Sequence, residues 1–459
     1  MKQVRRVLPI IAGLLVLVVV SLGLVIAGHG TDAPVERAVT IHIASPWQVT
    51  LNSRAGRIFI VGYTAGGTGA RVVSTLDTTT GHEVNATPGQ ASNPPQIYSS
   101  PGIQPLVDAE TNRLFLFGQS GTSILDATSG ATLATIPRTG DSAALADQGA
   151  RLLLADSASD HVYLLDARNG RLLRTVAAGH LPRSLAVDAR TARAFVYNAG
   201  DATVSMLDAG SGRILRTTAH VWGGEELAVD TATGRVFAAA SNTRAVSVLD
   251  ASTGALLRTT RVGRAPGLLC VDERRGRVLV VDHFDNTVSV LDAASGRLLR
   301  TTKVGKSPVA LALDRQVGHA VVVNYGDGTA GTLDTATGAL LQTVHVGISP
   351  EAVAVDERTS RTFVIANGNG YGIVAVLDTR TGKLLWTTRV GERPDTVMVD
   401  EAAGRALVLS AYGGAEPAPD RWTWLPGWLR DRLLWIAPRP TPAPSSTSTA
   451  SLHILDVTR

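Results

Sequence analysis

The chain has 459 residues, of which 43 are Lys or Arg, 39 are Asp or Glu and 44% are hydrophobic. This apolar content can build a large core, which excludes a wholly disordered chain, and the single cysteine excludes a disulfide framework. A formal charge of +4 on this length is too small for a nucleic-acid-binding surface, so nucleic acid is not an expected partner.

The chain opens with an apolar run that is long enough to cross a bilayer. Residues 1–6 form a basic stub, and residues 7–28 are almost entirely apolar. At about 1.5 Å per residue this run spans a hydrocarbon layer of about 30 Å, so it predicts a transmembrane helix or uncleaved signal anchor. A linker follows over residues 29–37. The basic stub places the N-terminus inside the cell and the remainder outside, at the cell membrane. Cleavage after the run would instead give a secreted or periplasmic protein.

The rest of the chain repeats one unit. An apolar residue followed by Asp or Asn before a turn occurs nine times, and a Leu-Asp pair also occurs nine times, in several successive units at a spacing of 42 residues. The Leu-Asp pairs end at Asp77, Asp126, Asp166, Asp208, Asp250, Asp292, Asp334, Asp378 and Asp456.

Each unit contains four short strand-like runs, as between Ser184 and Val221, where Val, Leu, Phe and Thr are bounded by Gly, Asn and Asp. Four strands in 40–45 residues are typical of one propeller blade. The sequence therefore predicts an all-β fold, a single closed β-propeller over residues 38–459. Nine blades are expected, or eight if residues 88–140 do not form two complete blades.

Units such as residues 264–305, RAPGLLCVDERRGRVLVVDHFDNTVSVLDAASGRLLRTTKVG, resemble the YVTN/YncE-type β-propeller repeat. The resemblance implies the propeller fold. It also implies kinship with exported and surface-associated binding proteins, and more distantly with quinoprotein dehydrogenases. Residues 38–46 resemble a fourth strand and its exit, whereas the last unit stops after its third strand, so residues 38–46 are expected to complete the last blade.

Several motifs have structural explanations. Most Leu-Asp pairs are followed by glycine four residues after the Asp, a spacing that predicts a tight turn capped by the Asp side chain. Cys270 aligns with small residues in the innermost strand and is expected to pack there. The ten histidines lack metal-binding spacings, so no metal or cofactor is expected.

Because antiparallel strands alternate in direction, the loops between second and third strands share one face with the connections between blades. This face is the candidate ligand face. It collects polar residues from both kinds of loop: Arg183, Asn198, Glu225, Arg244, His283, Asp285, Lys306, Asn324, Tyr325, Glu351, Asn367, Arg393 and Asp395. Many of these residue types also form tight turns.

The last unit carries an insertion over residues 412–450, rich first in Trp and then in Pro, Ser and Thr. Its tryptophans are candidates for a lid over the ligand face or for contact with a partner: Trp422, Trp424, Trp428 and Trp435.

The leading hypothesis is a membrane-anchored extracytoplasmic propeller that binds a ligand or protein without catalysis. The alternative is a propeller enzyme, either a quinoprotein-like dehydrogenase or a metal-dependent hydrolase or lactonase. The sequence does not identify the ligand or the oligomeric state.

Overall fold

The computed structural model describes residues 36–41, 43–64, 71–88, 105–118, 121–221, 226–239, 242–368, 370–412 and 450–456. Residues 35–458 form one compact unit, and residues 1–34 with residue 459 form another that lies outside the described residues. The apolar run at residues 7–28 and the tryptophan-rich insertion also lie outside them. Within the described part of the chain, no helix is long and apolar enough to cross a membrane.

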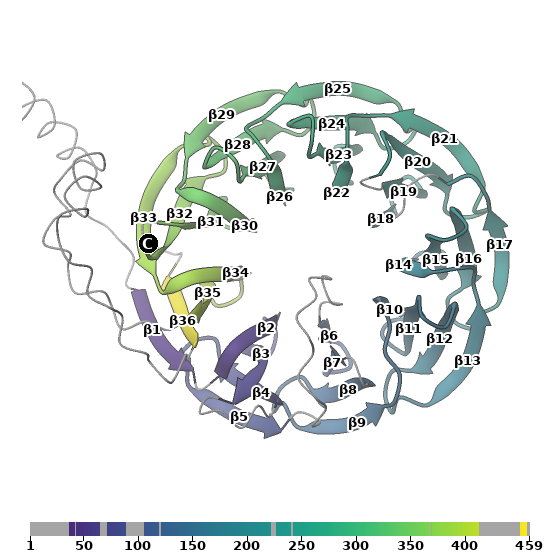
Figure 1. The fold of residues 1–459 in the computed structure, drawn as a ribbon, viewed down its shortest axis with the longest axis horizontal. Coiled ribbons are helices and arrows are strands. Elements are labelled where there is room, and N and C mark those ends of the chain that lie inside the picture. Colours follow the sequence, from purple (N-terminus) through teal and green to yellow (C-terminus); the bar gives the residue numbers. More distant parts are fainter. Residues whose placement is uncertain are drawn as a thin grey trace, which may run out of the picture. The chain divides into compact units, whose positions relative to one another are not determined.

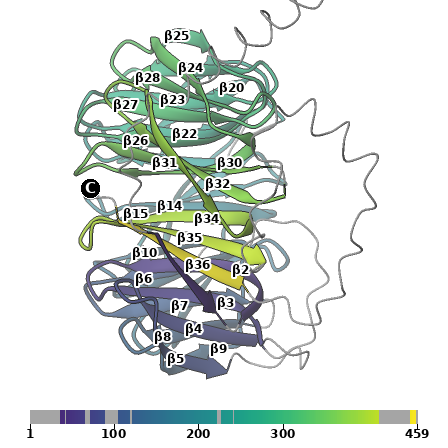
Figure 2. The ribbon, with the colours of Figure 1, turned by 90° about the vertical axis from the view of Figure 1, so that its left-hand side faces the viewer.

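The described residues of the larger unit form a ring of nine antiparallel four-stranded sheets (Figure 1). From the side, inner strands such as β34 run along the axis of the ring (Figure 2), whereas outer strands such as β21 follow its rim (Figure 1). The sequence prediction of an all-β propeller with nine blades is therefore confirmed. The eight-blade alternative is wrong, because the divergent region supplies a complete blade, β6–β9.

The blades follow one another around the ring in chain order. The first three comprise β2 (Ile43–Asn52), β3 (Arg57–Thr64), β4 (Arg71–Asp77), β5 (Glu83–Pro88); β6 (Leu106–Asp108), β7 (Arg113–Gly118), β8 (Gly121–Asp126), β9 (Thr132–Ile136); β10 (Ser142–Ala146), β11 (Arg151–Asp156), β12 (His161–Asp166) and β13 (Leu172–Ala177). The next three comprise β14 (Pro182–Asp188), β15 (Arg193–Asn198), β16 (Thr203–Asp208), β17 (Ile214–Thr218); β18 (Glu226–Asp230), β19 (Arg235–Ala239), β20 (Ala245–Asp250), β21 (Leu256–Arg261); β22 (Pro266–Asp272), β23 (Arg277–Asp282), β24 (Thr287–Asp292) and β25 (Leu298–Lys303). The last three comprise β26 (Pro308–Asp314), β27 (His319–Asn324), β28 (Thr329–Asp334), β29 (Leu340–His345); β30 (Ile348–Asp356), β31 (Arg361–Asn367), β32 (Gly372–Asp378), β33 (Leu384–Val390); β34 (Glu392–Asp400), β35 (Arg405–Tyr412), β36 (Ala450–Asp456) and β1 (Glu36–Ile41).

The core lies between blades, because a single blade cannot bury both faces of its sheet. In one cluster, Leu279 of β23 and Val288 of β24 pack with Val322 of β27 and Leu333 of β28 from the next blade. The middle strands of each blade are therefore almost continuously apolar, whereas the outermost strands expose most of their residues.

The hairpin between third and fourth strands has the predicted turn. The carboxylate of Asp250 accepts hydrogen bonds from Thr253 N–H at 2.9 Å and Ser252 N–H at 3.0 Å, and Gly254 has φ of 69°. The side chains of Ser252 and Thr253 also donate to Asp250. Led by the Ser252 hydroxyl, these bonds lower the pKa of Asp250 to about 2. The structural explanation of the Leu-Asp motif is thus confirmed.

Buried hydroxyl groups and partly exposed guanidinium groups link neighbouring blades. The hydroxyl of Thr260 in β21 donates to Gly296 O, 2.6 Å away in the neighbouring blade, and Arg235 Nε donates to Ala294 O at 3.1 Å. Thr218 makes the corresponding bond to Gly254 O at 2.7 Å. The repeated threonine of the fourth strand therefore holds the hairpin of the following blade.

The two ends of the described ring meet in one sheet. β1 pairs with β36, with Glu36 opposite Leu455 and Ile41 opposite Ala450. Ile43 already belongs to β2 of the first blade, so the closing strand ends earlier than residues 38–46. The last blade is thus built from segments at opposite ends of the sequence.

Candidate functional site

The turns of each blade divide between the two faces of the ring. In the blade β22–β25, residues 273–276 and 293–297 connect β22 to β23 and β24 to β25 on what we call the hairpin face. Residues 283–286 connect β23 to β24, and residues 304–307 lead to the next blade, on what we call the loop face. The loop face is the candidate ligand face of the sequence analysis.

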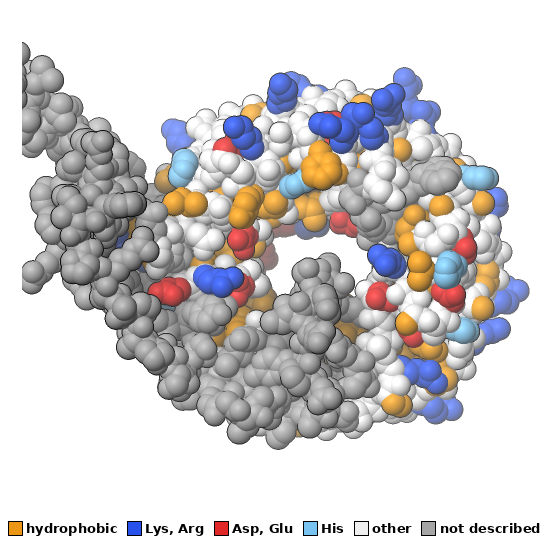
Figure 3. Space-filling model, viewed as in Figure 1, with side chains coloured by type: hydrophobic (Ala, Val, Ile, Leu, Met, Phe, Trp, Pro, Cys, Tyr) orange, Lys and Arg blue, Asp and Glu red, His pale blue; other side chains and the backbone are white. Residues whose placement is uncertain are grey.

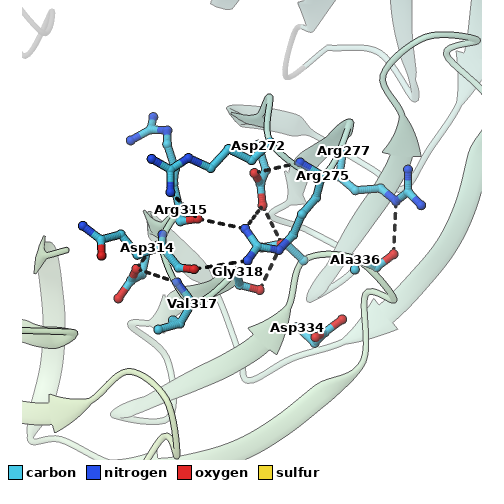
Figure 4. Close-up of polar contacts among 12 residues, drawn as sticks. Asp272, Arg275, Arg277, Asp314, Arg315, Val317, Gly318, Asp334 and Ala336 are labelled. Atoms are coloured by element: carbon cyan, nitrogen blue, oxygen red, sulfur yellow. Dashed lines mark hydrogen bonds and ion pairs between the residues drawn. The ribbon is translucent and has the colours of Figure 1, made fainter. Parts of the chain in front are cut away.

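On the hairpin face, polar side chains of one blade bind groups of the neighbouring blade (Figure 4). Arg275 Nη1 lies 3.3 Å from Asp272 Oδ2 and donates at 2.9 Å to Arg315 O in the next blade. The Thr335 hydroxyl donates to the same Asp272 oxygen at 2.6 Å. These contacts satisfy the buried carboxylate of Asp272 and hold the blades together.

Several predicted residues of the loop face support its loops. Asn198 and Asn324 are fully buried, and their amides donate to Thr203 and Thr329 hydroxyls, each at 3.0 Å. Asn367 pairs with Ile348 and Gly372 in the sheet.

Asp285 is held by two arginines. Its carboxylate accepts from Arg264 Nε at 2.6 Å and Arg264 N–H at 2.8 Å, and from Arg244 Nη2 at 3.4 Å. The side-chain bond of Arg264 is the main cause of a lowered pKa of Asp285.

Other predicted residues remain at the surface or lie outside the described part. Arg183 and Glu351 are exposed, and Tyr325 is 43% exposed, while the backbone of Lys306 donates to Asp327 at 2.9 Å. Glu225 and the four tryptophans lie outside the described residues.

A separate cluster of charged residues lies near the starts of the innermost strands β30 and β34. Desolvation raises the pKa of Asp395, Arg393 opposes this effect, and Glu351 adds to it. The structure therefore brings three of the predicted residues together: Glu351, Arg393 and Asp395.

A pocket of about 410 Å³ opens among three blades of the loop face. Its lining comes from β18, from the blade β22–β25 and from the start of β26: Glu226, Ala265, Gly267, Leu268, Val281, His283, Phe284, Pro308 and Val309. Figure 3 shows hydrophobic side chains over this part of the inner rim, with basic side chains beyond them. The walls are apolar except for one carboxyl and one imidazole.

Glu226 is the unusual residue of the pocket. At the aligned place in neighbouring innermost strands stand Ser184, Leu268, Ala310 and Ala352. Burial raises the pKa of Glu226 to about 7, although Leu269 N–H donates to its carboxylate from the next blade. A carboxyl with this pKa changes its charge near neutral pH.

Sequence reasoning selected the neighbouring Glu225 and missed Glu226. The available signal was a carboxyl residue at a strand position where other units have small or apolar residues.

His283 and Phe284 form one wall of the pocket. His283 Nδ1 lies 2.9 Å from Pro308 O. A carbonyl oxygen can only accept a hydrogen bond, so Nδ1 carries the proton and Nε2 is the acceptor of the neutral ring. The Phe284 ring centroid lies 5.3 Å from that of His283, and Phe284 is 64% exposed. His283 was selected from the sequence; Phe284 was not.

Cys270 lies in β22 beneath this region and packs partly against the core between β23 and β27. Burial raises the pKa of its thiol to about 11, so the thiol is protonated at neutral pH. Within the described residues, no group of three or more His, Cys, Asp or Glu side chains could hold a metal ion.

Nine four-stranded blades define this chain as a β-propeller repeat protein. A family model described as "Outer membrane protein assembly factor BamB" matches residues 200–402, and no curated protein matches. Similar solved structures include BamB from Moraxella catarrhalis, with 15% identity and a TM-score of 0.49 over 72% of this chain and 96% of that one. They also include the dihydro-heme d1 dehydrogenase NirN in complex with DHE, with 14% identity and a TM-score of 0.49 over 65% and 68% of the chains. Kuenenia stuttgartiensis hydrazine synthase has 16% identity and a TM-score of 0.43 over 64% and 100%.

Proposed function

We propose that this chain is a membrane-anchored, extracytoplasmic propeller of the YVTN/YncE type that binds a protein partner without catalysis. The observation that carries the proposal is the apolar pocket on the loop face, with Phe284 exposed at its edge. Exposed aromatic residues beside apolar hollows are typical anchors of protein interfaces. The family match over residues 200–402 includes every residue of the pocket and belongs to a protein described as an assembly factor.

The position of the first strand shows on which face the described chain joins the ring. Glu36 lies opposite Leu455, near the end of β36. In other blades the end of the third strand leads into the hairpin face. The first described strand therefore begins on the hairpin face of the ring.

A photo-crosslinking amino acid at position 284 of the full chain tests the binding function in intact cells. We expect a discrete adduct from this position. The matched control carries the same amino acid at Ser295, an exposed residue of the hairpin face. Absence of any adduct from position 284 in a folded, membrane-associated protein would contradict the proposed function.

Protease accessibility tests the orientation independently. We expect the ring to be digested in intact cells or spheroplasts after partial unfolding. Digestion that requires membrane lysis would contradict an external ring.

A further inference from the structure

The polar groups lining the pocket share one chemical property. Deprotonated Glu226 is an acceptor, and His283 uses its Nδ1 proton on Pro308 O, which leaves Nε2 as an acceptor. The other lining side chains are apolar, apart from a glycine with no side chain. The side chains of the pocket therefore match a ligand that donates hydrogen bonds.

The position of these groups defines the shape of that ligand. Glu226 is partly buried, whereas Leu268 and Phe284 are 38% and 64% exposed. The carboxyl thus lies deeper than the apolar residues at the opening, and Val281 and Val309 contribute further apolar wall. A matching ligand has an apolar stem and a donor group at its end.

The surrounding charges are compatible with a cationic end group. Arg264, which donates to Phe284 O, shares the carboxylate of Asp285 with Arg244, so one of these two positive charges is offset. Burial penalises the Glu226 carboxylate in the empty pocket, and a cation beside the carboxylate would offset this penalty. Charge complementarity thus favours a cation over a neutral donor.

We propose that this pocket binds the side chain of an arginine or lysine presented by a protein partner, with the aliphatic stem between Leu268 and Phe284 and the cationic group at Glu226. The inference rests on the proposed binding function and names the chemistry that the partner presents. Arginine and lysine both carry an apolar stem that ends in hydrogen-bond donors.

Ligand-observed NMR titration of the purified full chain tests this assignment. The probes are Nα-acetyl-arginine amide and its nearly isosteric neutral counterpart, Nα-acetyl-citrulline amide. We expect the arginine probe to bind at least about tenfold more tightly, because a charge-assisted hydrogen bond is roughly twice as strong as a neutral one. Equal affinities would overturn the proposal.

Two variants locate the preference. Glu226→Gln should remove the preference for arginine over citrulline, whereas Glu110→Gln, at an exposed carboxyl of the hairpin face, should keep it. Melting temperatures confirm that both variants fold. An undiminished preference in Glu226→Gln would place the cation elsewhere and overturn the assignment.

The pH dependence gives a second readout. With a pKa of about 7, Glu226 is about one-tenth ionised at pH 6 and about nine-tenths at pH 8. Affinity for the arginine probe should therefore rise about tenfold over this range, while affinity for citrulline changes less. The Cys270 thiol stays protonated over this range because its pKa is about 11, and the Asp285 carboxylate stays ionised because its hydrogen bond from Arg264 lowers its pKa. A flat profile for arginine would contradict a role for Glu226.

The crosslinking experiment separates failure of this assignment from failure of the proposed function. If an adduct forms at position 284 but its yield is the same in Glu226→Gln, the pocket binds a partner through another chemistry. If position 284 gives no adduct at all, the binding function itself fails.

Discussion

Replacing Glu226 by Gln should stabilise the empty ring at alkaline pH. Glutamine keeps an oxygen that accepts from Leu269 N–H but cannot become charged. In the wild type, burial disfavours the carboxylate, so ionisation favours the unfolded chain. The variant removes this penalty without removing the hydrogen bond to the neighbouring blade.

The sign and the magnitude follow from the two pKa values. Below pH 4.5 the carboxyl is protonated in both states, and the variant has no advantage. Between pH 4.5 and about 7 the unfolded chain ionises first, and above about 7 the penalty is complete. At 1.36 kcal/mol per pKa unit the full penalty is about 3 kcal/mol. For a ring of this size the corresponding rise in melting temperature is about 3 °C.

Differential scanning calorimetry of both proteins from pH 4 to pH 8 checks this prediction. The melting temperatures should coincide at pH 4 and diverge steadily up to pH 8. A difference that is constant with pH would refute the reasoning, because it would show that lost packing, and not ionisation, separates the two proteins.

Three further predictions concern the ring. Thr260→Val should lower the free energy of unfolding by about 1–3 kcal/mol, because it leaves Gly296 O without its buried donor. The control Thr343→Val, at an exposed position of a fourth strand, should change the free energy of unfolding by less than about 0.5 kcal/mol. Thermal melts measure both variants. Deleting residues 36–41 should lower the melting temperature, since β36 loses its partner strand; an unchanged temperature would reject the importance of this pairing. Cys270 should react slowly with iodoacetamide at pH 8 until the protein is denatured, because its pKa is about 11; rapid labelling of the folded protein, followed by mass spectrometry, would contradict a buried thiol.

The sequence predicted the architecture well because every blade repeats the same four strands, which bury their faces against the neighbouring blades. The Leu-Asp turns, typified by Asp250 and Gly254, mark each hairpin and could be counted directly. The fourth-strand threonine was visible as a pattern, but its partner lies in the next blade, so the bond from Thr260 to Gly296 required the structure.

The candidate site was less accessible to sequence analysis. Asn198 and Asp285 have the residue types of a polar ligand site, yet their side chains bind the loops of the ring itself. One sequence cannot distinguish these uses, because loops and ligands require the same donors and acceptors. Glu226 lies in a strand and becomes unusual only beside Leu268 and Phe284, which come from another blade.

The composite last blade has a consequence for folding kinetics. Glu36 and Leu455 are neighbours in the sheet but lie about 400 residues apart, so closing this loop costs about 2 kcal/mol more chain entropy than closing a single blade. During synthesis the preceding blades can form one after another. The apolar cluster that joins β3 to β35 and β36 can form only after β36 has been made. We therefore expect closure of the last blade to be a late step of folding, because its pairing joins the most distant parts of the described chain.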